Sequence, residues 1–136
     1  MATFLMTLVS PERLQFAEQV SQADLPGVEG DFGVLSGHAP IVAVLRPGMV
    51  TAITGDQRRR FVVMGGLAEF SNDELTVLGE TVTAAEEFDA VGLQEQIDEM
   101  QKGLSQKSAG DEFDQAIALI DHYKSIHAML TVTSAF

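Results

Sequence analysis

Three residue types that form hydrolytic triads fall within eight positions of one stretch. Asp31, Ser36 and His38 lie in LPGVEGDFGVLSGHAP, residues 25–40. The serine is fourth in GVLSG, so it does not match the G-x-S-x-G turn that exposes a nucleophilic serine. A triad also requires a nucleophile, a base and an orienting acid connected in space, which sequence neighbours seldom provide. We therefore expect no catalytic residues here.

The glycines of the same stretch suggest a second chemistry, a phosphate-binding loop. Gly27, Gly30 and Gly33 are spaced G-x-x-G-x-x-G. A phosphate loop has the pattern G-x-x-x-x-G-K-[ST], and no lysine follows here. Glu29 and Asp31 would also repel a phosphate anion. The spacing and the charge both argue against this function.

Metal binding has equally little support in the sequence. His122 and His127, two of the three histidines, are five positions apart and would point in different directions on a helix. The carboxylates of GDEFD, residues 110–114, lack the spacing and the central glycine of a calcium loop. The absence of cysteine excludes thiolate nucleophiles, disulfides and Cys-based metal sites. We expect no metal and no cofactor.

The irregular stretch therefore has another role. Its run of residues 32–35, FGVL, is an interface if it is exposed on a turn. The same run is a short core strand if it folds inward. Both interpretations hold if alternate side chains face opposite ways.

Composition limits the partners of the chain. It has 136 residues, 46% of them apolar, and a formal net charge of −12, which argues against direct binding of nucleic acid or anionic lipid. The cluster Arg58-Arg59-Arg60 is a small footprint for nucleic acid, so we interpret it as a solvated hairpin shoulder or a contact with an acidic partner. We see no signal peptide and no apolar run long enough for membrane insertion.

The elements that position these residues are predicted to be strands up to residue 84. The runs TFLMTLV, LQFAEQV, MVTAIT, RRFVVM, LAEF and ELTVL are rich in β-branched and aromatic residues, and turn residues such as Gly55-Asp56 separate them. This spacing favours an antiparallel sandwich or barrel. Gly65-Gly66 indicates a bulge or a close backbone approach.

Beyond this point the apolar period changes to that of a helix. One helical face carries Leu93, Ile97, Met100 and Leu104. Asp89 is a candidate N-cap, residues 105–110 form a loop, and Asp111 is a candidate cap for a second helix. We predict a two-helix antiparallel hairpin over residues 85–136. It is too short for a robust core of its own, so it must pack on the β domain or on another protein.

Several motifs together resemble a known family. They are GDFG (30–33), GHAP (37–40), PG (47–48) and GGLAE (65–69). In this order, and over the whole chain, they are similar to the epsilon subunits of F-type ATP synthase, called delta in mitochondria. The resemblance implies a ten-stranded antiparallel β-sandwich, residues 1–84, followed by the helical hairpin, residues 85–136.

The family also implies a function and two interfaces. Its members are non-catalytic subunits of the central stalk, which couple the rotating c-ring to the gamma subunit. The resemblance assigns to the c-ring interface Glu29, Asp31, Phe32, Gly33, Val34 and Leu35, and to the gamma interface His38, Ala39 and Pro40. It implies a peripheral position at the cytoplasmic face of a bacterial inner membrane. The lack of a transit peptide favours a bacterium, although a chloroplast-encoded copy would look similar.

The hairpin departs from the family in two respects. Some members bind ATP through Ile/Leu-Asp-x-x-Arg-Ala; here FDAVGL, residues 88–93, keeps Asp89 but has Gly92 in place of the arginine and Leu93 in place of the alanine. Without that guanidinium we predict weak or no ATP binding. Strongly inhibitory members carry a basic second helix that meets the alpha/beta catalytic head. Residues 87–136 hold three basic and nine acidic residues, a net charge of −6, so we predict a weak inhibitor of ATP hydrolysis.

Two other classes of function remain open. A stand-alone ligand-binding β-sandwich requires a concave apolar pocket with converging polar groups. A small hydrolase is the weaker alternative because of the spacing described above. Co-purification with gamma and the c-ring supports the stalk subunit, whereas a lone monomer that binds a metabolite supports the sandwich module. The apolar stripes of the hairpin leave open whether it is docked or extended.

Overall fold

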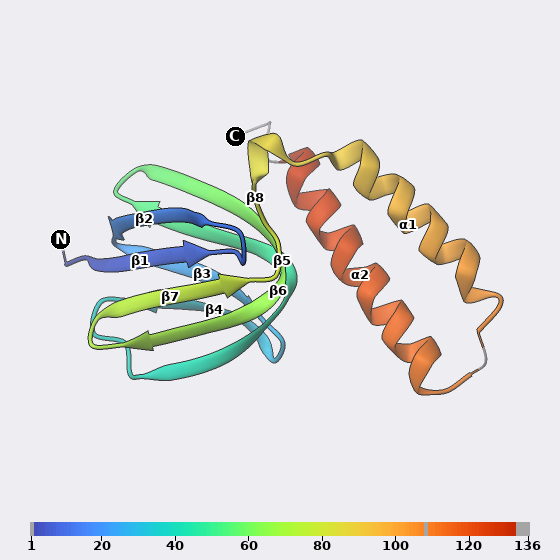
Figure 1. Ribbon diagram of the computed structural model, residues 1–136, viewed down its shortest axis with the longest axis horizontal. Helices are drawn as coiled ribbons and strands as arrows, with labels where there is room; N and C mark the ends of the chain where they lie inside the picture. The colour runs from blue at the N-terminus through green and yellow to red at the C-terminus, as the bar shows by residue number, and fades with distance from the viewer. Residues whose placement is uncertain (1, 108, 133–136) are drawn as a thin grey trace. The chain divides into compact units, whose positions relative to one another are not determined.

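The computed structural model describes residues 2–107 and 109–132 (Figure 1). The chain divides into two compact units, residues 1–86 and 87–136. The first unit is built of strands and the second of helices, as the change in apolar period predicts.

The first unit contains eight strands among the described residues. They are β1 (Phe4–Val9), β2 (Leu14–Val20), β3 (Gln22–Gly27), β4 (Gly30–Leu35), β5 (Ile41–Thr54), β6 (Gln57–Ser71), β7 (Glu74–Gly79) and β8 (Val82–Ala84). They are connected in the order β2-β1-β7-β6-β5-β3-β4, with β8 paired to β6. The expected sandwich is present. The prediction of ten antiparallel strands is wrong in number, because the described residues form eight strands, and in direction, because β1 pairs parallel to β7.

The difference in count has a structural cause. β5 and β6 have 14 and 15 residues, and their pairing is interrupted once, between the pairs Leu45–Gly66 and Pro47–Met64. On one side of this interruption β6 pairs with β7, and the sheet continues to β1 and β2. On the other side β6 pairs with β8, and β5 pairs with β3 through residues 51–53; one further pair with β3, Gly27–Leu45, lies at the interruption itself. Each long strand therefore serves both layers of the sandwich, and a count that splits each of them reaches ten.

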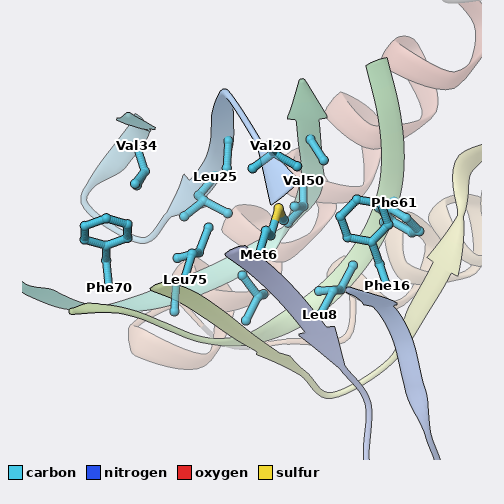
Figure 2. Packing of buried hydrophobic residues seen from close by; sticks show 14 of the residues in the cluster. Met6, Leu8, Phe16, Val20, Leu25, Val34, Val50, Phe61, Phe70 and Leu75 are labelled. Carbon is cyan, nitrogen blue, oxygen red and sulfur yellow. The ribbon is translucent and has the colours of Figure 1, made fainter. Parts of the chain in front are cut away.

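The core lies between the two layers. β1 alternates buried and half-buried residues along its length, the period expected of a strand with one inward face. Figure 2 shows Val34 of β4 and Phe70 of β6 pointing toward one another, and both are almost fully buried. The rings of Phe4 and Phe70 meet edge to face with centroids 5.5 Å apart, a favourable aromatic geometry.

The predicted close approach at the glycine pair is present. Gly66 has φ +150°, and a Cβ atom there would lie 2.0 Å from the carbonyl oxygen of Leu78. Only glycine allows β6 to pass β7 at this distance. The glycine therefore fixes the point at which β6 turns from one layer into the other.

The second unit is a helical hairpin. A 3₁₀ turn, Ala85–Glu87, precedes α1 (Ala90–Leu104), and α2 covers Asp111–Val132. The two helices run antiparallel through a short loop (Figure 1). Asp89 is the N-cap of α1, and Leu93 and Ile97 on the predicted apolar face are buried. The side-chain spacing thus predicted both the start of α1 and its buried face.

Candidate protein-interaction surface

The predicted c-ring residues lie on a two-residue hairpin between β3 and β4. Glu29 is in the turn, and the pairs Gly27–Gly30 and Leu25–Phe32 close the strands on either side. β4 is an edge strand, hydrogen-bonded to β3 alone in the described sheet. We call residues 27–31 the tip.

Side chains along β4 alternate between the core and the surface. Val34 is fully buried, and Phe32 is half-buried against the same core. Asp31, Gly33 and Leu35 are exposed, and 56% of Leu35 is accessible. The run FGVL is therefore a core strand whose other face is open for contact, and the exposed residues are the candidates for an interface.

Arg46, which the sequence did not single out, fastens the tip to β5. Its Nη1 donates to the carbonyl oxygen of Gly27 at 2.8 Å, and its Nη2 donates to Oδ1 of Asp31 at 2.5 Å. The backbone N–H of Val28 also donates to the carbonyl oxygen of Val44 at 2.9 Å. The two bonds from the Arg46 guanidinium are charge-assisted, and such bonds are stronger and more directional than neutral ones. The tip is thus held to the sandwich by three bonds.

The predicted gamma residues lie in the loop between β4 and β5. The His38 ring packs edge-on against Phe70 with centroids 5.8 Å apart. Its Nδ1 lies 2.7 Å from the carbonyl oxygen of Ala39, which can only accept, so Nδ1 is the donor. Ala39 and Pro40 are exposed. This loop leads directly into β5 and the surface described next.

The three triad residue types do not form a hydrogen-bonded chain. Ser36 Oγ donates to Asp73 rather than to His38. Asp31 pairs with Arg46, and the His38 ring bonds to the loop backbone. Proximity in sequence therefore produced the resemblance to a triad, as the spacing argument predicted.

A second feature that the sequence analysis missed is an exposed apolar face. Four large apolar side chains are 44–69% accessible on neighbouring strands: Val42, Val44, Leu67 and Leu78. We call them the apolar face. Val44 pairs with Leu67 and Leu67 with Leu78, so three of them form one row across β5, β6 and β7. Contiguous exposed apolar groups of this kind mark interaction sites.

Grooves join the apolar face to the tip. One, of about 760 Å³, is lined by Val9, Pro11, Val44, Leu67, Leu78 and Glu80 among others. A second, of about 470 Å³, lies between residues 27–32 and residues 41–44. Val44 lines both grooves, so the tip and the apolar face form one continuous surface. The available signal was IVAVL, residues 41–45, because an unbroken apolar run predicts a strand that is covered on both faces.

One member of the arginine cluster, Arg59, makes contacts within its own unit. Arg59 lies 5.5 Å and 5.7 Å from the ring centroids of Phe16 and Phe61, and 3.7 Å from a carboxylate oxygen of Glu18. These contacts hold the guanidinium of Arg59 against the strand surface. They favour the hairpin-shoulder interpretation of the cluster.

The aspartate of the degenerate ATP motif has a structural role. Asp89 Oδ1 accepts a hydrogen bond from the backbone N–H of Gly92 at 2.9 Å. A Cβ atom at Gly92 would lie 2.4 Å from Asp89 Oδ2, so the glycine leaves room for the cap. The predicted capping role of Asp89 is confirmed. No group of three or more potential metal-binding side chains occurs within residues 2–107 and 109–132.

A β-sandwich with one apolar outer face and a fastened tip, followed by a helical hairpin, defines a protein-interaction subunit. The chain belongs to the ATP synthase delta/epsilon chain family, whose β-sandwich domain model matches residues 3–85. The resemblance inferred from the loop motifs is thereby confirmed. No helix in the described part of the chain is long and apolar enough to cross a membrane.

Curated relatives agree with this assignment, and two solved structures share the fold. The chain is 56% identical to ATP synthase epsilon chain 2 of Nitrobacter hamburgensis, over all of both chains. It is 52% identical to the ATP synthase epsilon chain of Rhodopseudomonas palustris, over 98% of each. Its fold is similar to a chain in the Euglena gracilis mitochondrial ATP synthase (OSCP/F1/c-ring), with TM-score 0.80 and 22% identity, covering 96% of this chain and 82% of that one. A chain in the Tetrahymena thermophila central stalk/c-ring structure gives TM-score 0.63 and 16% identity, with coverages of 95% and 94%.

Proposed function

We propose that the chain is a non-catalytic rotor subunit of a proton-translocating F-type ATP synthase, which couples the c-ring to the gamma subunit in the central stalk. Family membership supports the assignment of the chain to this complex, and one structural observation supports the coupling role. The tip, fixed by Arg46 and Asp31, lies on the same continuous surface as the apolar face. Coupling two partners requires a subunit that contacts both of them and does not deform under the force between them.

The chemistry of the surface suggests which part meets which partner. The apolar face, together with His38, Ala39 and Pro40, is assigned to gamma, because permanent subunit interfaces are more apolar than transient ones. The tip residues Glu29 and Asp31, with Gly33 and Leu35, are assigned to the c-ring. In this assignment Phe32 and Val34 support β4 from the core side.

The location follows from the complex. We place the subunit at the cytoplasmic face of a bacterial inner membrane, peripheral to the bilayer. The relatives at 56% and 52% identity come from the bacteria Nitrobacter hamburgensis and Rhodopseudomonas palustris, which supports this location.

The hairpin is proposed to be a weak regulator of ATP hydrolysis through contact with the catalytic head. The charge of residues 87–136, −6, does not favour contact with an acidic segment of that head. Asp89 is already bonded to the start of α1, and Gly92 offers no side chain to a phosphate. Both observations support weak inhibition and weak or absent ATP binding.

The decisive experiment is affinity purification of the tagged full-length chain from solubilised membranes. Recovery of gamma and the c-ring is the expected result, and exchange of Leu67 for glutamate should reduce it. The groove of about 760 Å³ favours one alternative, a stand-alone ligand-binding module. Recovery of a lone monomer carrying a metabolite would support that alternative instead.

A further inference from the structure

Asp73 joins two loops that are far apart in the sequence. It lies in the turn between β6 and β7, and its carboxylate accepts two hydrogen bonds from the loop between β4 and β5. Ser36 Oγ donates to Oδ2 at 2.9 Å, and the backbone N–H of Gly37 donates to Oδ1 at 2.9 Å. Each carboxylate oxygen therefore holds one group of the loop.

The turn itself does not require this carboxylate. Asn72 and Asp73 are both left-handed, with φ +51° and +59°, a conformation that asparagine and aspartate both tolerate. Asn72 has the same backbone need but makes none of the described hydrogen bonds to residues 36–40. The side chain of Asp73 thus has a purpose beyond the local conformation.

The two hydrogen bonds that Asp73 accepts are the long-range contacts that anchor the loop between β4 and β5. The other hydrogen bonds described for residues 36–40 are local, from His38 N–H to Leu35 and between the His38 ring and Ala39. The His38 ring also packs on Phe70, which precedes the same turn by two residues. One turn therefore supports the loop both by packing and by its carboxylate.

We propose that Asp73 is a positioning residue, which holds residues 38–40 in the conformation that docks on the gamma subunit. This inference rests on the proposed function, since it needs that loop to be part of an interface. A loop that is fixed before binding loses less conformational entropy on binding than a mobile one, which raises affinity. Removal of the carboxylate should weaken docking without touching any contact residue.

The test compares variants of the full-length chain for binding to the gamma-containing core complex prepared without this subunit. We expect Asp73→Ala to weaken binding about tenfold. Asn72→Ala is the matched control, because it removes a side chain from the same left-handed turn and should leave affinity unchanged. Asp73→Asn should restore most of the affinity, since its amide oxygen accepts from Gly37 and its N–H₂ can donate to Ser36.

Two further measurements separate positioning from general stability. Amide hydrogen exchange at Gly37 and His38 should accelerate in Asp73→Ala and not in Asn72→Ala. Ser36→Ala should weaken binding by an intermediate factor. If Asp73→Ala does not fold, the affinity of Ser36→Ala tests the positioning role in its place. Equal affinity of the Asp73→Ala and Asn72→Ala variants, or an unchanged affinity of Ser36→Ala in that case, would overturn the inference. A wild-type chain that does not bind the core at all contradicts the proposed function instead.

Discussion

The guanidinium of Arg46 donates from Nη2 to Oδ1 of Asp31 at 2.5 Å and joins β5 to the tip, at the interruption in the pairing of β5 with β6. The Arg46 side chain is 24% exposed and that of Asp31 74%, so solvent screens much of the charge attraction. The bond to Gly27 is less exposed and fixes the direction of the guanidinium. We expect geometry, more than charge, to be what this pair contributes.

Arg46→Met should loosen the tip. The loss of two hydrogen bonds should lower the free energy of unfolding by about 1 kcal/mol and accelerate amide exchange at Val28. Chemical denaturation and hydrogen exchange measure these effects. Arg59→Met is the matched control. The ion pair of Arg59 with Glu18 is longer, at 3.7 Å, and Arg59 pairs with Ala52, several positions along β5 from the residues that contact the tip. Equal exchange at Val28 in both variants would contradict the fastening role.

Gly66→Ala should destabilise the sandwich severely, by about 3 kcal/mol or more. A Cβ atom there would meet the carbonyl oxygen of Leu78 at 2.0 Å, so the backbone must shift. Gly55→Ala is the control: its φ of +60° also strains alanine, but no heavy atom lies within 4 Å of the new Cβ atom. It should cost only about 1–2 kcal/mol. Thermal unfolding of both variants tests the difference, and similar losses would refute the close-approach argument.

Leu67→Glu should weaken binding to the gamma-containing core by at least about tenfold, because it buries a charge in an apolar interface. Leu67 is 44% exposed in the isolated chain, so the unfolding temperature of the Leu67→Glu variant should be close to that of the unchanged protein. Leu14→Glu is the control, since Leu14 is 57% exposed on β2 and does not line the two grooves. If both variants bind equally well, gamma does not dock on the apolar face.

Deletion of residues 88–136 should raise ATP hydrolysis by the whole enzyme by less than several-fold. The physical reason is the charge of residues 87–136, −6, which does not complement an acidic head. Hydrolysis assays on the complete complex with full-length and shortened subunits measure the effect. A larger rise would show that this hairpin is a strong inhibitor despite its charge.

Titration of the full-length chain with ATP should give a dissociation constant weaker than about 1 mM. Asp89→Ala should leave that titration unchanged while it lowers helix stability by about 1 kcal/mol, since Asp89 caps α1. Calorimetry and circular dichroism provide the two readouts. Binding near 1 mM that Asp89→Ala abolishes would restore the ATP-site interpretation.

Local patterns predicted much of the fold. Alternation along β1, the Gly55-Asp56 turn and the apolar face of α1 depend on neighbours within a few residues, so the sequence carries them directly. The parallel pairing of β1 with β7 could not be predicted in this way, because strands with one inward face alternate equally in either direction.

The surface was less predictable than the core. Arg46 reaches Asp31 over 15 positions and Asp73 reaches Gly37 over 36, distances at which the strand order decides which groups meet. The loop motifs located the tip, but no pattern identified its anchors. Only the apolar run at residues 41–45 gave a usable signal for the apolar face.

The continuity of β5 and β6 has a mechanical consequence. The two layers share two covalently continuous strands, which are hydrogen-bonded to one another on both sides of the single interruption. The layers therefore cannot shear past one another without stretching covalent backbone or breaking the ladder between residues 41–54 and 57–71. Force applied at the tip enters this pair at Arg46, beside the interruption. Under the proposed function, force from the ring would pass through this pair of strands with little deformation, and the compliance of the stalk would reside in its other parts.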